Sequence, residues 1–171
     1  MVLVIPFQVA VSANRGAAYD IVLLAHVLAA AAGLAVVATA GTYALLLRRS
    51  GSPSESVERY YRPGVNWAGR VIFLVPVLGV ALVAMSNGAW SYSDVWVGVG
   101  LALWAAVAMA GEMVLWPAER RLQQWVAADP SDPSDPSDHV DRRSLCLRVA
   151  VVSAGLLALL VAATVVMVSK P

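Results

Sequence analysis

Three side chains in the apolar parts of the sequence have the chemistry to bind a haem iron or a copper ion. His26 lies in an uncharged stretch, 21–47, and Met85 and Met167 are expected at a similar depth in other helices. An imidazole nitrogen and a thioether sulfur can together ligate haem iron or soft copper. His139 is expected in a loop at the opposite end, so two histidines of one chain cannot hold a haem. Two simpler roles stay open: methionine fills gaps in packing, and histidine can hydrogen-bond across helices.

Glu112 and Arg148 are the second candidate site. At about 1.5 Å per residue, Glu112 lies roughly 26 Å along the stretch that begins at Val95. Arg148 lies one turn into the last apolar stretch, measured from the same end. An ion pair between them would lower the cost of placing each charge in a membrane. Such a pair can belong to a proton path or can act as a structural clip near the interface, and we favour the clip.

The sequence contains no motif of a familiar catalytic class. It has no Gly-rich phosphate loop, no nucleophile elbow, no HExxH zinc motif and no paired CxxC. The single cysteine, Cys146, excludes an internal disulfide and a metal cage built from cysteines alone. There is also no row of buried acids of the kind that a pump or transporter needs. We therefore expect a protein that is not an enzyme.

Four apolar stretches have to position these side chains. The first, 21–47, has no acid and no base except His26, and about 20 apolar residues are enough to cross a bilayer core. Hydrophobic residues make up 60% of the chain and the mean hydropathy is +0.72, which excludes an ordinary soluble domain. We predict an all-α integral membrane protein, a four-helix up-down bundle over 20–171, with spans at 21–47, 71–90, 95–116 and 145–168.

Two features inside the predicted spans carry further expectations. Pro76 should kink the second span, and a neighbouring helix should satisfy the carbonyl that the proline leaves free. Trp104 lies near the middle of the third span, where it is expected to pack in the core or to face a partner.

The remaining segments are polar or short. Residues 1–19 are expected to form an outer, ordered or interfacial leader, because no basic segment precedes the apolar run 2–11. Pro117 is expected to end the third span. Residues 118–128 then form an amphipathic stretch that lies on the membrane surface or continues as a solvated helix. The Asp-Pro-Ser repeat at 129–138 predicts an extended linker, and both segments belong to a cytoplasmic region, 118–144.

The distribution of basic residues predicts the orientation. The loops after the first and third spans together carry nine Arg, whereas the other side carries only Arg15 and Lys170. Basic loops stay in the cytoplasm, so both termini should face outward across a bacterial inner (plasma) membrane. The preference for Arg over Lys, with abundant Ala and Val, is typical of a GC-rich bacterial genome.

Small residues spaced by four are expected to hold the helices together. Lipid tails are as apolar as leucine, so helices associate where small residues let their backbones approach closely. Such ladders occur in three of the spans: Ala25, Ala29, Gly33 and Gly41; Gly98, Ala102, Ala106 and Ala110; and Ala150, Ala154, Ala158 and Ala162.

Three short motifs resemble a known family. They are the LAHVLAA run at 24–30, the WSYSDVWV run at 90–97 and the MVSKP run at 167–171. Over about 19–171 the chain resembles a group of predicted bacterial four-span proteins, domain of unknown function 2269. That group is loosely similar to the copper-resistance D and HemJ-type membrane proteins, and in the HemJ type a histidine of an early span is associated with haem b. The resemblance implies a four-span fold and, through His26, haem b or copper as a cofactor.

Three functions are compatible with these patterns. We prefer a non-catalytic accessory or assembly subunit without a cofactor, surrounded by membrane lipids and other integral membrane subunits. A respiratory-chain (electron-transport) supercomplex of an actinobacterial-type organism is the host that we expect. The alternatives are a haem- or copper-handling protein that uses His26 and a small transporter or proton-relay protein that uses Glu112 and Arg148. The net charge of +1 gives no reason to expect a nucleic-acid partner.

Overall fold

The protein is all-helical throughout the part of the chain that the structure describes. The computed structural model describes residues 16–50, 53–62, 64, 67–127 and 136–169. Three helices are long and apolar enough to cross a membrane: α2 (Ala17–Ser50), the continuous helix Val95–Ala127, and the Asp141–Val168 part of α8 (Pro136–Val168). A shorter apolar helix covers Val71–Ala84. This confirms the all-α class and a chain that can cross a membrane several times.

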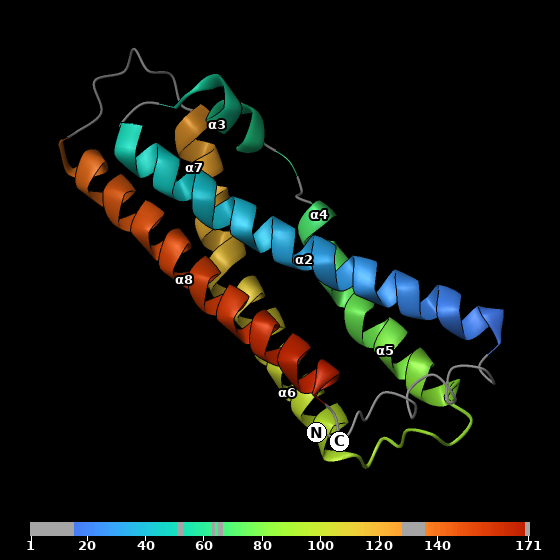
Figure 1. Ribbon diagram of the computed structural model, residues 1–171. Helices are drawn as coiled ribbons and strands as arrows, with labels where there is room; N and C mark the ends of the chain where they lie inside the picture. Colours follow the sequence, from blue (N-terminus) through green and yellow to red (C-terminus); the bar gives the residue numbers. More distant parts are fainter. Residues whose placement is uncertain (1–15, 51–52, 63, 65–66, 128–135, 170–171) are drawn as a thin grey trace, which may run out of the picture.

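Neighbouring helices run in opposite directions and form two pairs. In one pair α5 (Leu74–Ala84) packs on α2, and in the other α6 (Val95–Ala110) packs on α8. α2 and α8 also pack along each other and join the two pairs. The two pairs separate from each other toward the end that contains the start of α2 and the end of α8 (Figure 1). At the opposite end, α2 and α8 stay together and two further helices join them.

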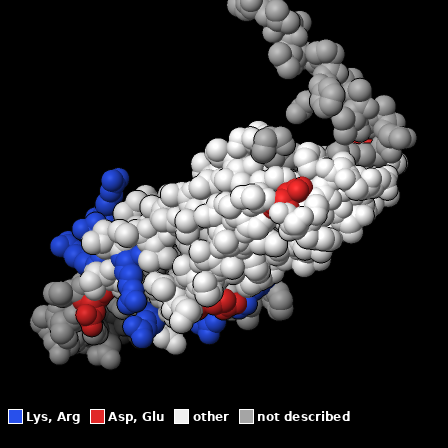
Figure 2. Space-filling view, turned by 90° about the horizontal axis from the view of Figure 1, so that it is seen from below, with Lys and Arg blue, Asp and Glu red and all other residues white. Residues whose placement is uncertain are grey.

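The tightest packing lies at the end where the arginines gather. There α3 (Glu55–Tyr60) and α7 (Trp116–Ala127) complete the bundle. The large side chains that are almost fully buried come from these four helices and their ends: Leu47, Val57, Tyr61, Leu122, Cys146 and Val149. Figure 2 shows the Lys and Arg side chains of one face gathered mainly at one end. The core is therefore a compact block at the basic end, from which longer apolar helices project.

Pro117, which is expected to end the third span, does not end the helix. The helix runs without a break from Val95 to Ala127 and contains a π-helical turn, η2 (Gly111–Leu115), just before the proline. A wider turn shifts the hydrogen-bond register, so a residue without an N–H can be accommodated. Of the two roles foreseen for 118–128, α7 has the second, a helical extension, with Leu122 fully buried and Arg120 and Arg121 exposed.

The second helix is shorter and less regular than the predicted span 71–90. It begins as α4 (Trp67–Arg70), continues through a 3₁₀ turn, η1 (Val71–Phe73), and ends with α5 at Ala84. Asn87 and Gly88 follow with φ of 52° and 80°. This left-handed backbone cannot continue a helix, and it explains why the helix ends before the predicted boundary.

Two other boundaries also differ from prediction. α2 begins at Ala17, four residues before the predicted span, and Asp20 lies in its first turn. α8 begins at Pro136, so the end of the predicted Asp-Pro-Ser linker is helical. Proline suits a first helical turn, where its missing N–H is not needed. The rest of that linker, 129–135, most of the predicted leader, 1–15, and Lys170–Pro171 lie outside the described residues.

Candidate functional site

The structure places the three predicted metal ligands in two different helix pairs. His26 on α2 lies against α5, where a Cβ added to Gly79 would be 3.3 Å from the imidazole Cε1. Met167 on α8 packs instead on Gly100 of α6. Met85 lies six residues beyond Gly79, about 9 Å further along the chain if helical rise is assumed. The candidate ligands are thus not gathered, and the described residues contain no cluster of three His, Cys, Asp or Glu side chains suited to a metal.

The predicted ion pair between Glu112 and Arg148 does not form. Glu112 pairs with Arg70, whose Nη1 donates to Oε1 at 2.7 Å. On α8 the buried face is made by Cys146 and Val149. Arg148 precedes Val149 by one residue, which is about 100° around the helix, and its side chain is exposed. The acid therefore takes its partner from the start of the second helix.

Arg70 also anchors an aromatic cluster. Its guanidinium Cζ lies 4.5 Å from the centre of the Trp116 ring. Phe73 contacts both Trp104 and Trp116, with ring centroids 6.0 Å apart in each case. Cation–π and edge-on ring contacts of this kind each contribute on the order of 1 kcal/mol. The cluster fixes α4 and η1 against the junction of α6 and α7.

The prediction that a neighbour compensates for Pro76 is confirmed. Pro76 has no N–H to donate to the carbonyl of Ile72, four residues earlier. The indole Nε1 of Trp104 on α6 donates to that carbonyl oxygen at 3.0 Å. Of the two roles expected for Trp104, the structure shows the internal one, since the ring packs against the core cluster. The mid-helix tryptophan therefore joins α6 to the irregular turn of the second helix.

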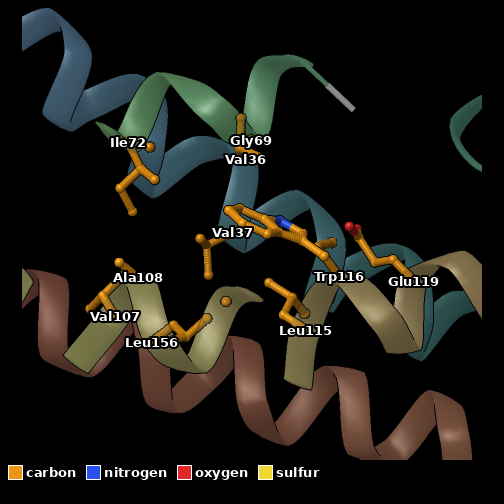
Figure 3. Close-up of a pocket in the computed structure, with 13 residues that line it drawn as sticks. Val36, Val37, Gly69, Ile72, Val107, Ala108, Leu115, Trp116, Glu119 and Leu156 are labelled. Carbon is orange, nitrogen blue, oxygen red and sulfur yellow. The ribbon is translucent and has the colours of Figure 1, made fainter. Parts of the chain in front are cut away.

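A small cavity of about 20 Å³ lies beside Trp116, one member of this cluster (Figure 3). It is enclosed by α2, α4, η1, the α6–α7 helix and one residue of α8. Apolar side chains and glycines form most of its wall: Gly33, Val36, Val37, Ala40, Gly69, Ile72, Val107, Ala108, Gly111, Leu115 and Leu156. Trp116 and Glu119 complete it, and they are the only lining residues with polar side chains. Glu119 is therefore one of two residues with polar side chains in the wall of a small, otherwise apolar space.

Glu119 is a site residue that the sequence analysis missed. Only 5% of the residue is exposed, and its Oε1 accepts a hydrogen bond from the Tyr60 hydroxyl at 2.8 Å. Burial raises the pKa of this carboxyl, and the bond from Tyr60 offsets part of that rise. The sequence does indicate that Glu119 is buried. It lies four residues after Leu115 and three residues before Leu122, so all three share one face of the helix. The acid belongs to the buried face of α7, not to its charged one.

The small-residue ladders fall into two groups. The ladder of α2 is internal: Ala29, Gly33 and Gly41 are buried. On α6 and α8 the ladders are internal only in part. Ala150 is buried, as expected for a residue that holds the bundle together, and Ala106 and Ala110 are half-buried. Gly98, Ala102, Ala154, Ala158 and Ala162 are exposed, against that expectation. The inner faces of these two helices are made by larger residues, including Val97, Val107, Val149 and Leu156.

Comparison with known proteins adds no family to these observations. No protein-family model, no curated protein and no solved structure matches the chain. The four-span family suggested by the three short motifs therefore stays a prediction.

Proposed function

We propose that this chain is a four-span protein of a bacterial inner membrane that serves as a non-catalytic accessory or assembly subunit of a larger membrane complex. The observation that carries the proposal is the outward-facing set of small residues on α6 and α8. We call it the small-residue face and define it as Gly98, Ala102, Ala154, Ala158 and Ala162.

The three long helices account for three spans, and we propose the helical segment 67–84, which is second in chain order, as the additional one. At about 1.5 Å per residue it is about 27 Å long, close to the thickness of a hydrocarbon core. Its start lies beside Glu112 and Trp116, so the Arg70–Glu112 pair would lie near the inner boundary of the membrane. The exposed arginines of α2, α7 and α8 lie beyond that boundary, which supports a cytoplasmic basic end and termini on the outer side.

The small-residue face is suited to another transmembrane helix. Bulky side chains are sufficient where a helix only meets lipid, and α5 has such a surface in Val77 and Val80. Small residues are enriched where two helix backbones approach closely, because dispersion and weak Cα–H···O contacts then become possible. A Cβ added to Gly98 would meet no atom within 4 Å. The space in front of this glycine is open to a helix from another subunit.

The proposed host complex is inferred from the sequence. We propose a respiratory-chain (electron-transport) supercomplex, on the basis of the bacterial composition and the lack of a catalytic motif in the sequence. The proposed partners are membrane lipids and other integral membrane subunits.

The proposal is tested by comparing tagged copies expressed at the chromosomal level and purified in a mild detergent. The test variant is Gly98→Leu with Ala102→Leu, which fills the small-residue face without touching the internal packing. The control is Val77→Leu with Val80→Leu, which adds one carbon at each of two exposed positions on a surface that is already bulky. We expect the wild type and the control to retain a membrane complex in fixed ratio and the test variant to lose it. A wild type that purifies alone, or a test variant that keeps the same complex, contradicts the proposal.

A haem- or copper-handling role is the second candidate. It is favoured by one observation: the imidazole Nδ1 of His26 is buried and has no hydrogen-bond partner among the described residues. The separation of Met167 from this histidine counts against a ligand pair. Metal analysis and a visible spectrum of the purified protein decide the matter. Absence of both haem and copper, or binding that is unchanged in His26→Ala, excludes this role.

A further inference from the structure

The carboxyl of Glu119 lies in the core at the basic end without a cation to balance a negative charge. Among the described residues, no Arg, Lys or His nitrogen is within 4 Å of it, and the only ion pairs there are Arg59–Glu55 and Arg70–Glu112. Its one direct partner is the neutral hydroxyl of Tyr60. A buried carboxylate normally needs a cation or several N–H donors. The surroundings of Glu119 therefore suit a neutral carboxylic acid.

The charged groups of the neighbouring helices contact residues other than Glu119. On α2, Arg48 lies near Cys146, and the described residues show no ion pair between this arginine and Glu119. On α4, Arg70 is held by Glu112 of η2 and by the ring of Trp116. On α8, the guanidinium Cζ of Arg142 lies 4.5 Å from the centre of the Trp125 ring. Arg142 also interacts electrostatically with Cys146.

The other neighbours of Glu119 are aromatic hydroxyls. On α2, Tyr43 stacks on Tyr60, with ring centroids 4.6 Å apart. Tyr61, next to α3, has a buried hydroxyl with no hydrogen-bond partner among the described residues. Burial raises the pKa of the Tyr61 hydroxyl, so this group stays neutral. Neutral groups thus dominate the immediate surroundings of the acid.

The cavity beside Glu119 has the size of a single water molecule. About one probe sphere, roughly 10–15 Å³, is the smallest volume that can hold a water, and this cavity has about 20 Å³. A water also needs polar partners, and Glu119 and Trp116 are the lining residues whose side chains carry polar groups. In Figure 3 these two side chains lie next to each other at one side of the cavity. A protonated carboxyl can donate to such a water while it accepts from Tyr60.

We propose that Glu119, together with one water molecule in this cavity, forms a proton-binding site that ties α3 to the rest of the bundle. In the docked state the carboxyl is protonated, accepts from Tyr60 and donates to the water. When α3 leaves, water reaches the carboxyl, which releases the proton to solvent. Because the pKa of Glu119 is raised in the docked state, docking is strongest at low pH and weakens as the pH rises through that pKa.

The protonated acid is tested directly by infrared spectroscopy of the purified, reconstituted protein near neutral pH. We expect a carbonyl-stretching band of a protonated carboxylic acid that disappears in Glu119→Gln. The control is Glu58→Gln, which changes an exposed acid of α3 and should leave the band in place. A wild type without the band, or a band that survives in Glu119→Gln, overturns the proposal.

The water is tested with Gly111→Ala. A Cβ at Gly111 would meet the Trp116 ring at 3.8 Å, an ordinary contact, so the methyl occupies cavity space without a clash. Displacing the water should shift the same infrared band toward the position of an acid with fewer hydrogen bonds. An unshifted band shows that no water is bound to Glu119 and contradicts that part of the proposal.

The link to α3 is tested by hydrogen exchange of the α3 amides as a function of pH, corrected for the intrinsic exchange rate. In the wild type, protection of α3 should fall as the pH rises. In Glu119→Gln, a neutral side chain of the same shape, protection should be kept at high pH and lose its pH dependence. A wild type whose α3 protection is independent of pH, or a variant with the wild-type pH profile, overturns the coupling.

Discussion

The hydrogen bond between Trp104 and the carbonyl of Ile72 yields a prediction with a built-in control. Trp104→Phe removes the indole donor and leaves a carbonyl that Pro76 cannot serve. An unsatisfied buried acceptor costs about 1–3 kcal/mol in soluble proteins, whereas polar contacts between membrane helices average about 0.6 kcal/mol, with a maximum near 1.7. We therefore expect a loss of about 1 kcal/mol in the free energy of unfolding, roughly fivefold in the unfolding equilibrium.

A double-mutant cycle separates this bond from the other contacts of the ring. In Pro76→Ala the new backbone N–H can donate to the Ile72 carbonyl, so that carbonyl no longer depends on Trp104. The part of the cost that comes from packing on Phe73 should be the same in both backgrounds. We expect Trp104→Phe to cost about 1 kcal/mol less in the Pro76→Ala background, as a coupling energy measured by reversible unfolding in mixed micelles. Equal costs in the two backgrounds refute the assigned role of Trp104.

Two further predictions follow from close contacts and exposure. Gly41→Ala should lower the free energy of unfolding by about 1–3 kcal/mol, because the new Cβ would lie 2.9 Å from the Cβ of Ser153. If the variant is as stable as the wild type in the same assay, α2 and α8 do not cross as tightly as described. Arg70→Gln should cost up to about 1 kcal/mol, since its half-exposed pair with Glu112 is lost, whereas Arg148→Gln should stay within about 0.5 kcal/mol of wild type. A larger loss in the free energy of unfolding for Arg148→Gln would instead support the Glu112–Arg148 ion pair that the sequence predicts.

Much of the fold was accessible from the sequence because hydrophobic length is a strong local signal. The stretches 21–47, 95–116 and 145–168 all lie within the long helices. The missed features depend on tertiary contacts. Pro117 stays inside a helix because a π-helical turn absorbs it, and nothing in the local sequence distinguishes this from a helix end. The second helix begins early and irregularly, where it meets α2 and the α6–α7 junction.

The side-chain predictions failed where spacing along one helix could not reveal the partner. Depth alone suggested Arg148 for Glu112, but Arg70 is the residue that reaches it. Small-residue spacing predicted close helix packing without saying whether the neighbour belongs to the same chain. It is internal for Gly33 and Gly41 and external for Gly98. Glu119 could have been recognised by placing it on the helical wheel with Leu122, and it was missed because neighbouring charges suggested a solvated face.

The central claim, that the small-residue face contacts another membrane subunit, is tested most directly by photo-crosslinking in living cells. A photoreactive amino acid is placed at Ala158 on α8, and separately at Val77 on the exposed surface of α5. We expect the probe at Ala158 to capture one defined membrane protein and the probe at Val77 to give no protein adduct. If the probe at Ala158 reacts only with lipid, the small-residue face is not an interface and the proposed function is wrong.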